Sequence, residues 1–180
     1  MILKELLVAS NSIESFRELV LRYYKTTEVL VITGESYSSR LAEFIFDSEF
    51  NVVKAENNKL ATENNIYQKW LTFDIKCVVA VGGGKVLDLS KRISLLFGAE
   101  LFVFPTVISN DGLFSPVAVM EDDDGKSLSL KGRQPDSLYV DISIIENAPD
   151  LYLNSAIGDF LTNISACNDW ILAHRNNVES

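Results

Sequence analysis

The stretch Val78-Val-Ala-Val-Gly82-Gly83-Gly84-Lys85-Val86-Leu87-Asp88 decides the fold of this chain of 180 residues. A run of small and β-branched apolar residues ends at three glycines and a helical pattern follows, which predicts a buried strand, a tight turn and a helix. Glycine has no Cβ, so the backbone of this turn can approach a ligand closely. The first N–H groups of the helix point to the same place, and the helix dipole favours negative charge there. The sequence therefore predicts a site for a phosphate or a pyrophosphate.

The spacing of these glycines differs from the G-x-G-x-x-G fingerprint of dinucleotide-binding proteins. A strand-to-helix turn with a purely structural role is therefore an alternative interpretation. Three consecutive glycines exceed what such a turn requires, and each carries an entropic cost in the folded chain. We favour the phosphate site for this reason.

Short apolar runs and helical patterns alternate along the chain. The apolar runs predict strands at 28–33, 50–54, 77–81, 100–104 and 138–141. Apolar residues at helical spacing predict helices at 12–24, 37–46, 60–70 and 86–97, and from residue 150 onward. This alternation predicts an α/β fold with a Rossmann-like, mostly parallel sheet and flanking helices.

Two later segments depart from this alternation. Runs at 117–121 and 126–130 flank Asp122-Asp123-Asp124-Gly125, and Asp-Gly between two such runs predicts a β-hairpin. The three aspartates are interpreted as a solvated turn rather than as a metal site. In the helical segment, Gly158 predicts a break or a close approach. Trp70 and Trp170 are expected in the core or at an interface.

A second polar loop, Pro105-Thr-Val-Ile-Ser-Asn-Asp-Gly112, directly follows the strand at 100–104. Its short polar side chains are Thr106, Ser109, Asn110 and Asp111. In an open parallel sheet, ligands bind beyond the carboxyl ends of the strands, where this loop and the glycine turn both lie. Ser-Asn-Asp-Gly is also an ordinary turn composition. Two polar, glycine-bearing loops at the same sheet edge nevertheless favour a binding site.

Composition and charge exclude several classes of protein. The net charge of −9 argues against non-specific nucleic-acid binding, because phosphate contacts need clustered Lys and Arg. No apolar run approaches the roughly 20 residues of a membrane span, and the amino end carries charge too early for a secretory signal. Cys77 and Cys167 are far apart, which predicts reduced thiols, a cytoplasmic location and no metal site made by cysteine.

Two polar residues of the helical segment after residue 150 have simple interpretations on pattern alone. Asp159 belongs to the polar side of an amphipathic helix, since a carboxylate is costly to bury unless it is paired or bound to a metal. His174 is the only histidine of the chain, and it is interpreted as a surface or cap residue.

Three motifs together resemble the glycerol-1-phosphate dehydrogenases, which belong to the wider superfamily of iron-containing alcohol dehydrogenases and dehydroquinate synthases. The motifs are Gly82-Gly-Gly-Lys-Val-Leu-Asp-Leu-Ser-Lys91, Pro105-Thr-Val-Ile-Ser-Asn-Asp-Gly-Leu-Phe-Ser-Pro116, and Gly158-Asp-Phe-Leu-Thr-Asn-Ile-Ser-Ala-Cys-Asn-Asp-Trp170 with Leu172-Ala-His-Arg175. Their order and spacing match the family along essentially the whole chain. The resemblance implies an NAD(P)-binding α/β domain at 1–149 and the start of a carboxyl-terminal, helical, metal-binding domain at 150–180.

The resemblance also implies roles for individual residues. The positions that match cofactor-binding residues are Gly82, Gly83, Gly84, Lys85, Val86, Asp88, Thr106, Ser109 and Ser115. Asp111 matches a substrate-contacting residue, and Asp159 matches a carboxylate that binds Zn²⁺ and touches substrate, so both are catalytic candidates. The implied reaction is the NAD(P)-dependent reduction of dihydroxyacetone phosphate to sn-glycerol 1-phosphate, with zinc polarising the ketone.

The chain departs from this family at the metal site and in length. The family's zinc site needs an aspartate and two histidines, whereas the one histidine here, His174, lies at neither ligand position. Family members are also considerably longer. We therefore expect the cofactor-binding half of such an enzyme, inactive or weak alone, or a natural short relative. A non-catalytic nucleotide-binding or interaction protein and a dehydroquinate-synthase-like enzyme are the alternatives.

Two expectations concern partners and cofactor choice. Residues 151–175 carry apolar side chains that would normally pack on helices absent from this chain, which predicts self-association. Glu35 follows the strand at 28–33 and could accept a ribose hydroxyl of NAD, whereas Gly34 leaves room for the 2′-phosphate of NADP. We expect either cofactor to be tolerated.

Overall fold

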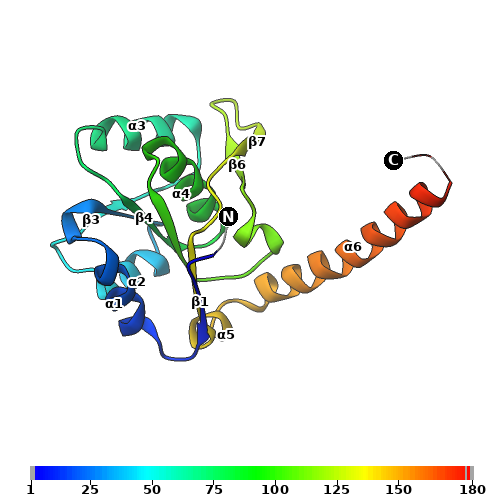
Figure 1. Ribbon diagram of the computed structural model, residues 1–180, viewed down its shortest axis with the longest axis horizontal. Coiled ribbons are helices and arrows are strands. Elements are labelled where there is room, and N and C mark those ends of the chain that lie inside the picture. Colours follow the sequence, from blue (N-terminus) through cyan, green and yellow to red (C-terminus); the bar gives the residue numbers. More distant parts are fainter. Residues whose placement is uncertain (1–2, 177, 179–180) are drawn as a thin grey trace.

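The computed structural model describes residues 3–176 and residue 178, and it contains a six-stranded parallel sheet with helices on both faces (Figure 1). The strand order is β1-β8-β5-β4-β2-β3. The strands are β1 (Glu5–Ala9), β2 (Val29–Thr33), β3 (Asn51–Lys54), β4 (Cys77–Gly82), β5 (Glu100–Pro105) and β8 (Ser137–Asp141). The predicted α/β class with a mostly parallel sheet is confirmed.

Helices cover this sheet on both faces, and each face has its own hydrophobic core. The helices are α1 (Ile13–Tyr23), α2 (Tyr37–Ile45), α3 (Leu60–Trp70), α4 (Gly84–Phe97), α5 (Ile142–Glu146) and α6 (Asp150–Arg175). Phe16 of α1 and Leu41 of α2 pack in one core, whereas Ile66 of α3 and Leu89 of α4 pack in the other. Coverage on both faces explains the continuous apolar sequences of β2 and β4, because every side chain of a central parallel strand is buried.

The hairpin predicted around Asp122 is present as strands β6 (Val117–Glu121) and β7 (Ser127–Lys131), which pair antiparallel. Gly125 has a φ of 80°, a left-handed conformation that glycine adopts without a steric penalty. The Asp122 carboxylate accepts hydrogen bonds from the backbone N–H groups of Asp124 and Lys126, at 3.0 and 2.8 Å. The predicted hairpin is therefore confirmed, and Asp122 shapes its turn.

The structure corrects the predicted amino-terminal part of the sheet. Strand β1 was not predicted, although it pairs with β8 in the register Leu7↔Tyr139. It is an edge strand, and the side chains of Leu6 and Val8 are 57% and 56% exposed. Because one face of β1 is open, its short run lacks the sequence signature of a buried strand. The short helix α5 was not predicted either.

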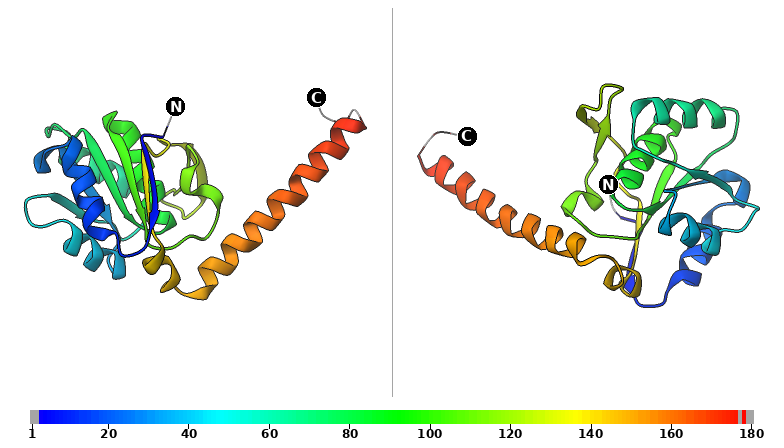
Figure 2. Two further views of the ribbon diagram at one scale, coloured as in Figure 1. Left: turned by 60° about the horizontal axis from the view of Figure 1, so that its bottom comes forward. Right: turned by 180° about the vertical axis from the view of Figure 1, so that it is seen from behind.

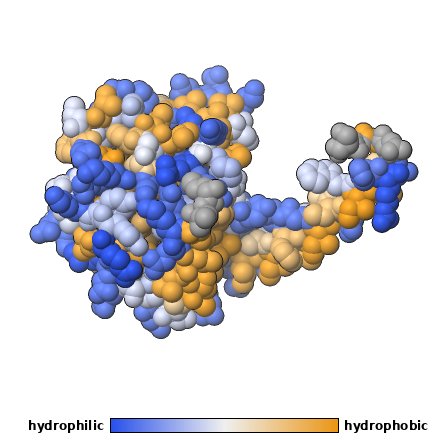
Figure 3. All heavy atoms as spheres, viewed as in Figure 1, coloured by the Kyte–Doolittle hydropathy of each residue, from blue (hydrophilic) through white to orange (hydrophobic). Residues whose placement is uncertain are grey.

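Helix α6 also differs from its prediction. Gly158 causes no break, because the helix is continuous and a Cβ at this position would meet nothing within 4 Å. Trp70 lies in the core as predicted, and Trp170 is 73% exposed, so of its two predicted places, the core or an interface, only the interface remains a prediction. No residue of α6 is buried, and the helix projects away from the sheet with apolar side chains along it (Figures 2 and 3). Within the described residues, no helix is long and apolar enough to cross a membrane.

Candidate functional site

The glycine turn lies between β4 and α4 and leaves the first amides of the helix free of side-chain caps. Gly82 ends the strand, Gly83 is the N-cap residue and Gly84 begins the helix, two residues earlier than predicted. The carbonyl of Gly82 accepts from the Thr106 N–H at 3.0 Å, and that of Gly83 accepts from the Leu87 N–H at 3.1 Å. Among the residues that the structure describes, no side chain caps the N–H groups of this first turn. These groups are therefore available to an anion.

The three glycines differ in what an added side chain would meet at each position. A Cβ at Gly82 would lie 2.8 Å from the Cβ of Val86, and a Cβ at Gly83 would lie 3.0 Å from Cγ2 of Val107. Close packing therefore requires glycine at position 82, and a side chain at position 83 would need Val107 to shift, reasons that the sequence pattern did not reveal. A Cβ at Gly84 would meet nothing within 4 Å. The third glycine therefore borders open space.

Open cavities surround the glycine turn at the carboxyl ends of the strands. One cavity of about 370 Å³ is lined by the turn from Gly83 to Val86 together with Val107, Ser109 and Tyr152. A neighbouring cavity of about 370 Å³ shares Gly83 and also contacts Thr106. The turn thus faces a crevice between the sheet edge and the start of α6.

A further cavity of about 320 Å³ lies beyond β2 and β3. It is lined by Gly34 and Glu35, by Glu56 and Asn57, and by Lys85 and Val86 of the glycine turn. Glu56 was not singled out from the sequence, although its place just after β3 is the kind of position that contacts a ligand in such sheets. This cavity therefore brings two carboxylates next to residues of the glycine turn.

The second polar loop reaches the same crevice only in part. Thr106 and Ser109 line cavities, whereas Ser115 is not among the lining residues described above. The Ser115 hydroxyl instead accepts a hydrogen bond from the Val117 N–H at 3.0 Å. The Asn110 side chain accepts from the Gly112 N–H at 3.0 Å and caps the 3-10 turn η2 (Asp111–Phe114).

Asp88 lies in the second turn of α4 and pairs with a lysine that the sequence analysis did not single out. Lys91 Nζ lies 3.4 Å from Asp88 Oδ1, and the lysine side chain is 2% exposed. Burial raises the pKa of Asp88 and lowers that of Lys91, and the attraction between the two charges opposes both effects. A lysine at position 91 on the apolar side of the helical pattern, four residues after Leu87, was the available signal.

Asp111 and Asp159 lie together, although they are far apart in the sequence. Asp159 Oδ2 accepts a hydrogen bond from the Asp111 N–H at 2.9 Å, and Asn163 Nδ2 donates to Asp111 Oδ2 at 3.0 Å. Helix α6 is therefore attached to η2 through these side chains. The interpretation of Asp159 as a merely solvated residue is incomplete, because its carboxylate takes part in a specific contact.

The described residues do not fit a catalytic zinc. Among residues 3–176 and 178, no group of three or more His, Cys, Asp or Glu side chains could hold a metal ion. His174 lies 15 positions beyond Asp159 in the same helix, which separates the two residues by about 22 Å at 1.5 Å per residue. Asp159 therefore offers one carboxylate, whereas a catalytic zinc usually has three protein ligands.

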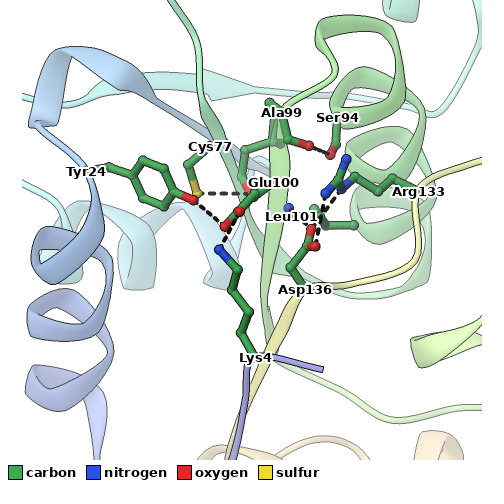
Figure 4. A network of polar contacts seen from close by, with 10 residues as sticks. Lys4, Tyr24, Cys77, Ser94, Ala99, Glu100, Leu101, Arg133 and Asp136 are labelled. Atoms are coloured by element: carbon green, nitrogen blue, oxygen red, sulfur yellow. Dashed lines mark hydrogen bonds and ion pairs between the residues drawn. The ribbon is translucent and has the colours of Figure 1, made fainter. Parts of the chain in front are cut away.

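A second polar cluster lies at the opposite, amino-terminal edge of the sheet (Figure 4). The Glu100 carboxylate accepts hydrogen bonds from the Lys4 ammonium and from the Tyr24 hydroxyl. Asp136 accepts from Arg133 Nε at 2.7 Å and from the Leu101 N–H at 2.8 Å. Burial, followed by the hydrogen bond to Glu100, raises the pKa of Tyr24. These groups satisfy one another.

The sequence of the chain matches a known family. The profile of the iron-containing alcohol dehydrogenases matches residues 7–149, which is most of the chain. The chain belongs to the iron-containing alcohol dehydrogenase family. The match ends one residue before α6 begins.

Curated relatives within this family carry a more specific name. The chain is 36% identical over 158 residues to the glycerol-1-phosphate dehydrogenase [NAD(P)+] of Archaeoglobus fulgidus, covering 86% of this chain and 45% of that protein. It is 32% identical over 177 residues to the enzyme of the same name from Sulfolobus acidocaldarius, covering 96% of this chain and 50% of that protein. The chain thus spans about half the length of the curated relatives that it matches.

Solved structures share the fold. Glycerol dehydrogenase from Schizosaccharomyces pombe superposes with a TM-score of 0.74 at 23% identity, covering 88% of this chain and 42% of that one. An iron-containing alcohol dehydrogenase from Thermotoga maritima superposes with a TM-score of 0.70 at 17% identity, covering 88% and 52%. At these identities the likeness establishes the fold alone.

Proposed function

We propose that this chain is the cofactor-binding part of an NAD(P)-dependent dehydrogenase that interconverts dihydroxyacetone phosphate and sn-glycerol 1-phosphate. The observation that carries the proposal is the uncapped first turn of α4, whose amides border open cavities at Gly84. The name of the curated relatives supports the choice of cofactor and substrate. The domain division at residues 149 and 150 forms part of the same proposal.

The cofactor would lie along the carboxyl edge of the sheet. Its pyrophosphate would rest on the amides of Gly84, Lys85 and Val86, where the helix dipole favours negative charge. The adenosine half would occupy the cavity beyond β2 and β3, and the nicotinamide half would lie towards Thr106. The bound nicotinamide would supply or accept the hydride. The residues of the chain would hold and orient it.

Asp111 is proposed to contact the phosphorylated substrate. It lies in the loop after β5, at the same sheet edge as the glycine turn, and its carboxylate is fixed by Asn163. The proposal that Asp159 ligates zinc needs further ligands, which the described residues do not provide. Reduction of the ketone by this chain alone is therefore expected to be weak or absent.

The cavity beyond β2 and β3 bears on the choice between the two nicotinamide cofactors. Glu35 and Glu56 both line it, and carboxylates accept hydrogen bonds from ribose hydroxyls but repel a 2′-phosphate. Lys85 also lines this cavity, and its Nζ lies 3.3 Å from Glu121 Oε1. We propose that both cofactors bind and that NAD binds more tightly.

A second candidate function is that of a nucleotide-binding protein without catalytic activity. We propose a cytoplasmic location for both candidates. This candidate is favoured because, among the described residues, no three His, Cys, Asp or Glu side chains are grouped so that they could hold a metal ion. In both cases the exposed apolar side chains of α6 support self-association of the chain through residues 151–175.

Calorimetric titration of NADH and NADPH, with and without zinc, tests the proposal. The wild-type chain is expected to bind NADH without zinc, and Gly84→Val is expected to weaken that binding at least ten-fold, about 1.4 kcal/mol, at an unchanged unfolding midpoint. Reduction of dihydroxyacetone phosphate that appears only when zinc is added would favour the dehydrogenase. NADH binding without any turnover would be compatible with both candidates, because the described residues provide no complete zinc site, and absence of NADH binding would contradict both.

A further inference from the structure

Lys91 is a buried ammonium whose contacts all involve one segment of chain and its counter-ion. Its Nζ donates to the carbonyl oxygen of Gly112 at 2.7 Å and to that of Val117 at 3.0 Å. Asp88 Oδ1 lies 3.4 Å from the same nitrogen. An ammonium has three donors and no acceptor, so these three oxygens satisfy it completely.

The two carbonyls that Lys91 contacts are the two ends of a short segment, 112–117. Within this segment the Ser115 N–H donates to the Gly112 carbonyl at 3.1 Å, which forms a local turn. This bond does not connect the segment to the rest of the protein. The Lys91 ammonium joins both ends of the segment to α4, the helix that begins at the glycine turn, and the Gly132 N–H also donates to the Pro116 carbonyl at 2.7 Å.

Residues 132 and 133 pack closely against the base of Lys91. A Cβ at Gly132 would lie 2.8 Å from the Cβ of Lys91, and the Arg133 N–H donates to the Lys91 carbonyl at 2.9 Å. Burying an ammonium is unfavourable unless it is paired and hydrogen-bonded, so an apolar side chain of similar length would fill this space at lower cost. The polar contacts of Lys91 therefore have a role beyond filling the core.

Asp111 is the residue that this connection holds in position. It directly precedes Gly112, its N–H donates to Asp159 Oδ2, and its carboxylate accepts from Asn163. Lys91 thus connects α4 to η2, and Asp159 and Asn163 connect η2 to α6. The glycine turn and Asp111 are thus attached to the same helix at points one to two turns apart.

We propose that Lys91 is a positioning residue that fixes the Asp111 segment against α4, so that Asp111 faces a substrate beside the bound cofactor. The part of this proposal that concerns substrate rests on the proposed function. Lys91 contacts neither cofactor nor substrate and acts through the Gly112 carbonyl.

Hydrogen exchange measured by mass spectrometry on the whole chain tests the structural part. Lys91→Met removes the donors and keeps a long apolar side chain. The variant is expected to speed amide exchange in 111–117 at least ten-fold, the effect of losing a charged hydrogen bond, while β4 stays protected. Lys85→Met is the matched control, because Lys85 is 67% exposed on the same helix and its ammonium pairs with Glu121. It should leave exchange in 111–117 unchanged.

Uniformly faster exchange in Lys91→Met would assign Lys91 to general stability and would overturn the proposal. If Lys91→Met does not fold, the double variant Asp88→Asn with Lys91→Met removes both charges and is measured in the same way. Failure of both variants to fold would likewise overturn it.

Binding of sn-glycerol 1-phosphate at saturating NADH tests the functional part. Lys91→Met is expected to weaken this binding about ten-fold while the dissociation constant of NADH changes less than about three-fold. Equal affinity for sn-glycerol 1-phosphate in both proteins would contradict the positioning role. If the wild-type chain binds neither molecule, the proposed function fails, and the exchange measurement still decides whether Lys91 fixes the segment.

Discussion

The two ends of the parallel sheet differ in how they use polar groups. At the amino-terminal end, Glu100 and Asp136 accept bonds from a lysine, a tyrosine, an arginine and a backbone amide, so the cluster is internally satisfied (Figure 4). At the carboxyl end, the first amides of α4 have no cap, and Glu35 and Glu56 line a cavity. Satisfied polar groups stabilise the fold, and unsatisfied groups at the edge of a cavity are available to a ligand.

We therefore expect substitutions at one end of the sheet to affect stability and substitutions at the other end to affect binding. Substitutions at the amino-terminal end should lower the free energy of unfolding without a specific effect on cofactor affinity. Substitutions that fill the space at the carboxyl end should lower affinity and leave the free energy of unfolding nearly unchanged.

Asp136→Ala should have the largest effect on stability. Its removal leaves Arg133 and the buried Leu101 N–H without their acceptor, which should cost about 3 kcal/mol of unfolding free energy. Urea denaturation measures this loss. Asp74→Ala is the control, because that carboxylate is 80% exposed and contacts only the exposed Lys76, and no measurable change is expected. Equal stability of the two variants would remove the structural role assigned to the cluster.

Gly82→Ala and Gly84→Ala should differ in their effect on stability, although both lie in the same turn. A methyl group at position 82 meets Val86 at 2.8 Å, so this variant should lose about 2 kcal/mol of unfolding free energy. A methyl group at position 84 meets nothing, so the stability of this variant should be unchanged or slightly higher. Denaturant midpoints compare the two proteins. A loss of stability in Gly84→Ala as large as in Gly82→Ala would show that both glycines serve packing.

Asp141 should make stability depend on pH in the acid range. Burial raises the pKa of this carboxyl, but hydrogen bonds from Ser12, Asn11 and Ser143 outweigh burial, and the pKa lies below its usual value. A lowered folded-state pKa stabilises the fold above the unfolded value of about 3.9, and this contribution is lost as the pH falls through the folded value. Asp141→Asn should cost about 1 to 2 kcal/mol at pH 7.

Denaturation of the wild-type protein and Asp141→Asn at pH 7 and near pH 3 checks the sign of this effect. The difference between the two proteins should shrink at the lower pH. A difference that stays constant or grows would contradict the assigned pKa shift.

Substitutions on α6 should have the smallest effect on stability, because they should change only the self-association of the chain. Helix α6 exposes Phe160, Ile164 and Trp170, and none of the three belongs to the buried core. Sedimentation velocity should show concentration-dependent dimers or larger species, and Phe160→Ser with Trp170→Ser should shift the chain towards monomer. A clean wild-type monomer at high concentration would contradict the prediction.

The elements of the central sheet could be predicted from the sequence because their residues are buried on both faces. The strands β2 and β4 are unbroken apolar runs, and the glycines that follow β4 mark where the chain turns. Strand β1 could not be found in this way, since the side chains of Leu6 and Val8 are more than half exposed. Its place is set by pairing with β8, which is more than 120 residues away in sequence.

The sequence predicted which two loops form the candidate site, but it did not predict the side-chain contacts that hold them together. The glycine turn and the loop after β5 do meet at one edge, because β4 and β5 are neighbours in a parallel sheet. The packing of Gly82 on Val86 and the contacts of Lys91 with Gly112 depend on side chains brought together only by folding. The contact between Asp111 and Asp159 likewise spans 48 positions.

The central claim is that the first amides of α4 bind the diphosphate of a dinucleotide. Titration of NADH into the ¹⁵N-labelled chain, followed by ¹H–¹⁵N correlation spectra, tests this claim residue by residue. We expect the amide signals of Gly84, Lys85 and Val86 to shift, because these N–H groups have no side-chain cap and border an open cavity. Absence of NADH binding, or binding that leaves these three signals unmoved, would contradict the claim.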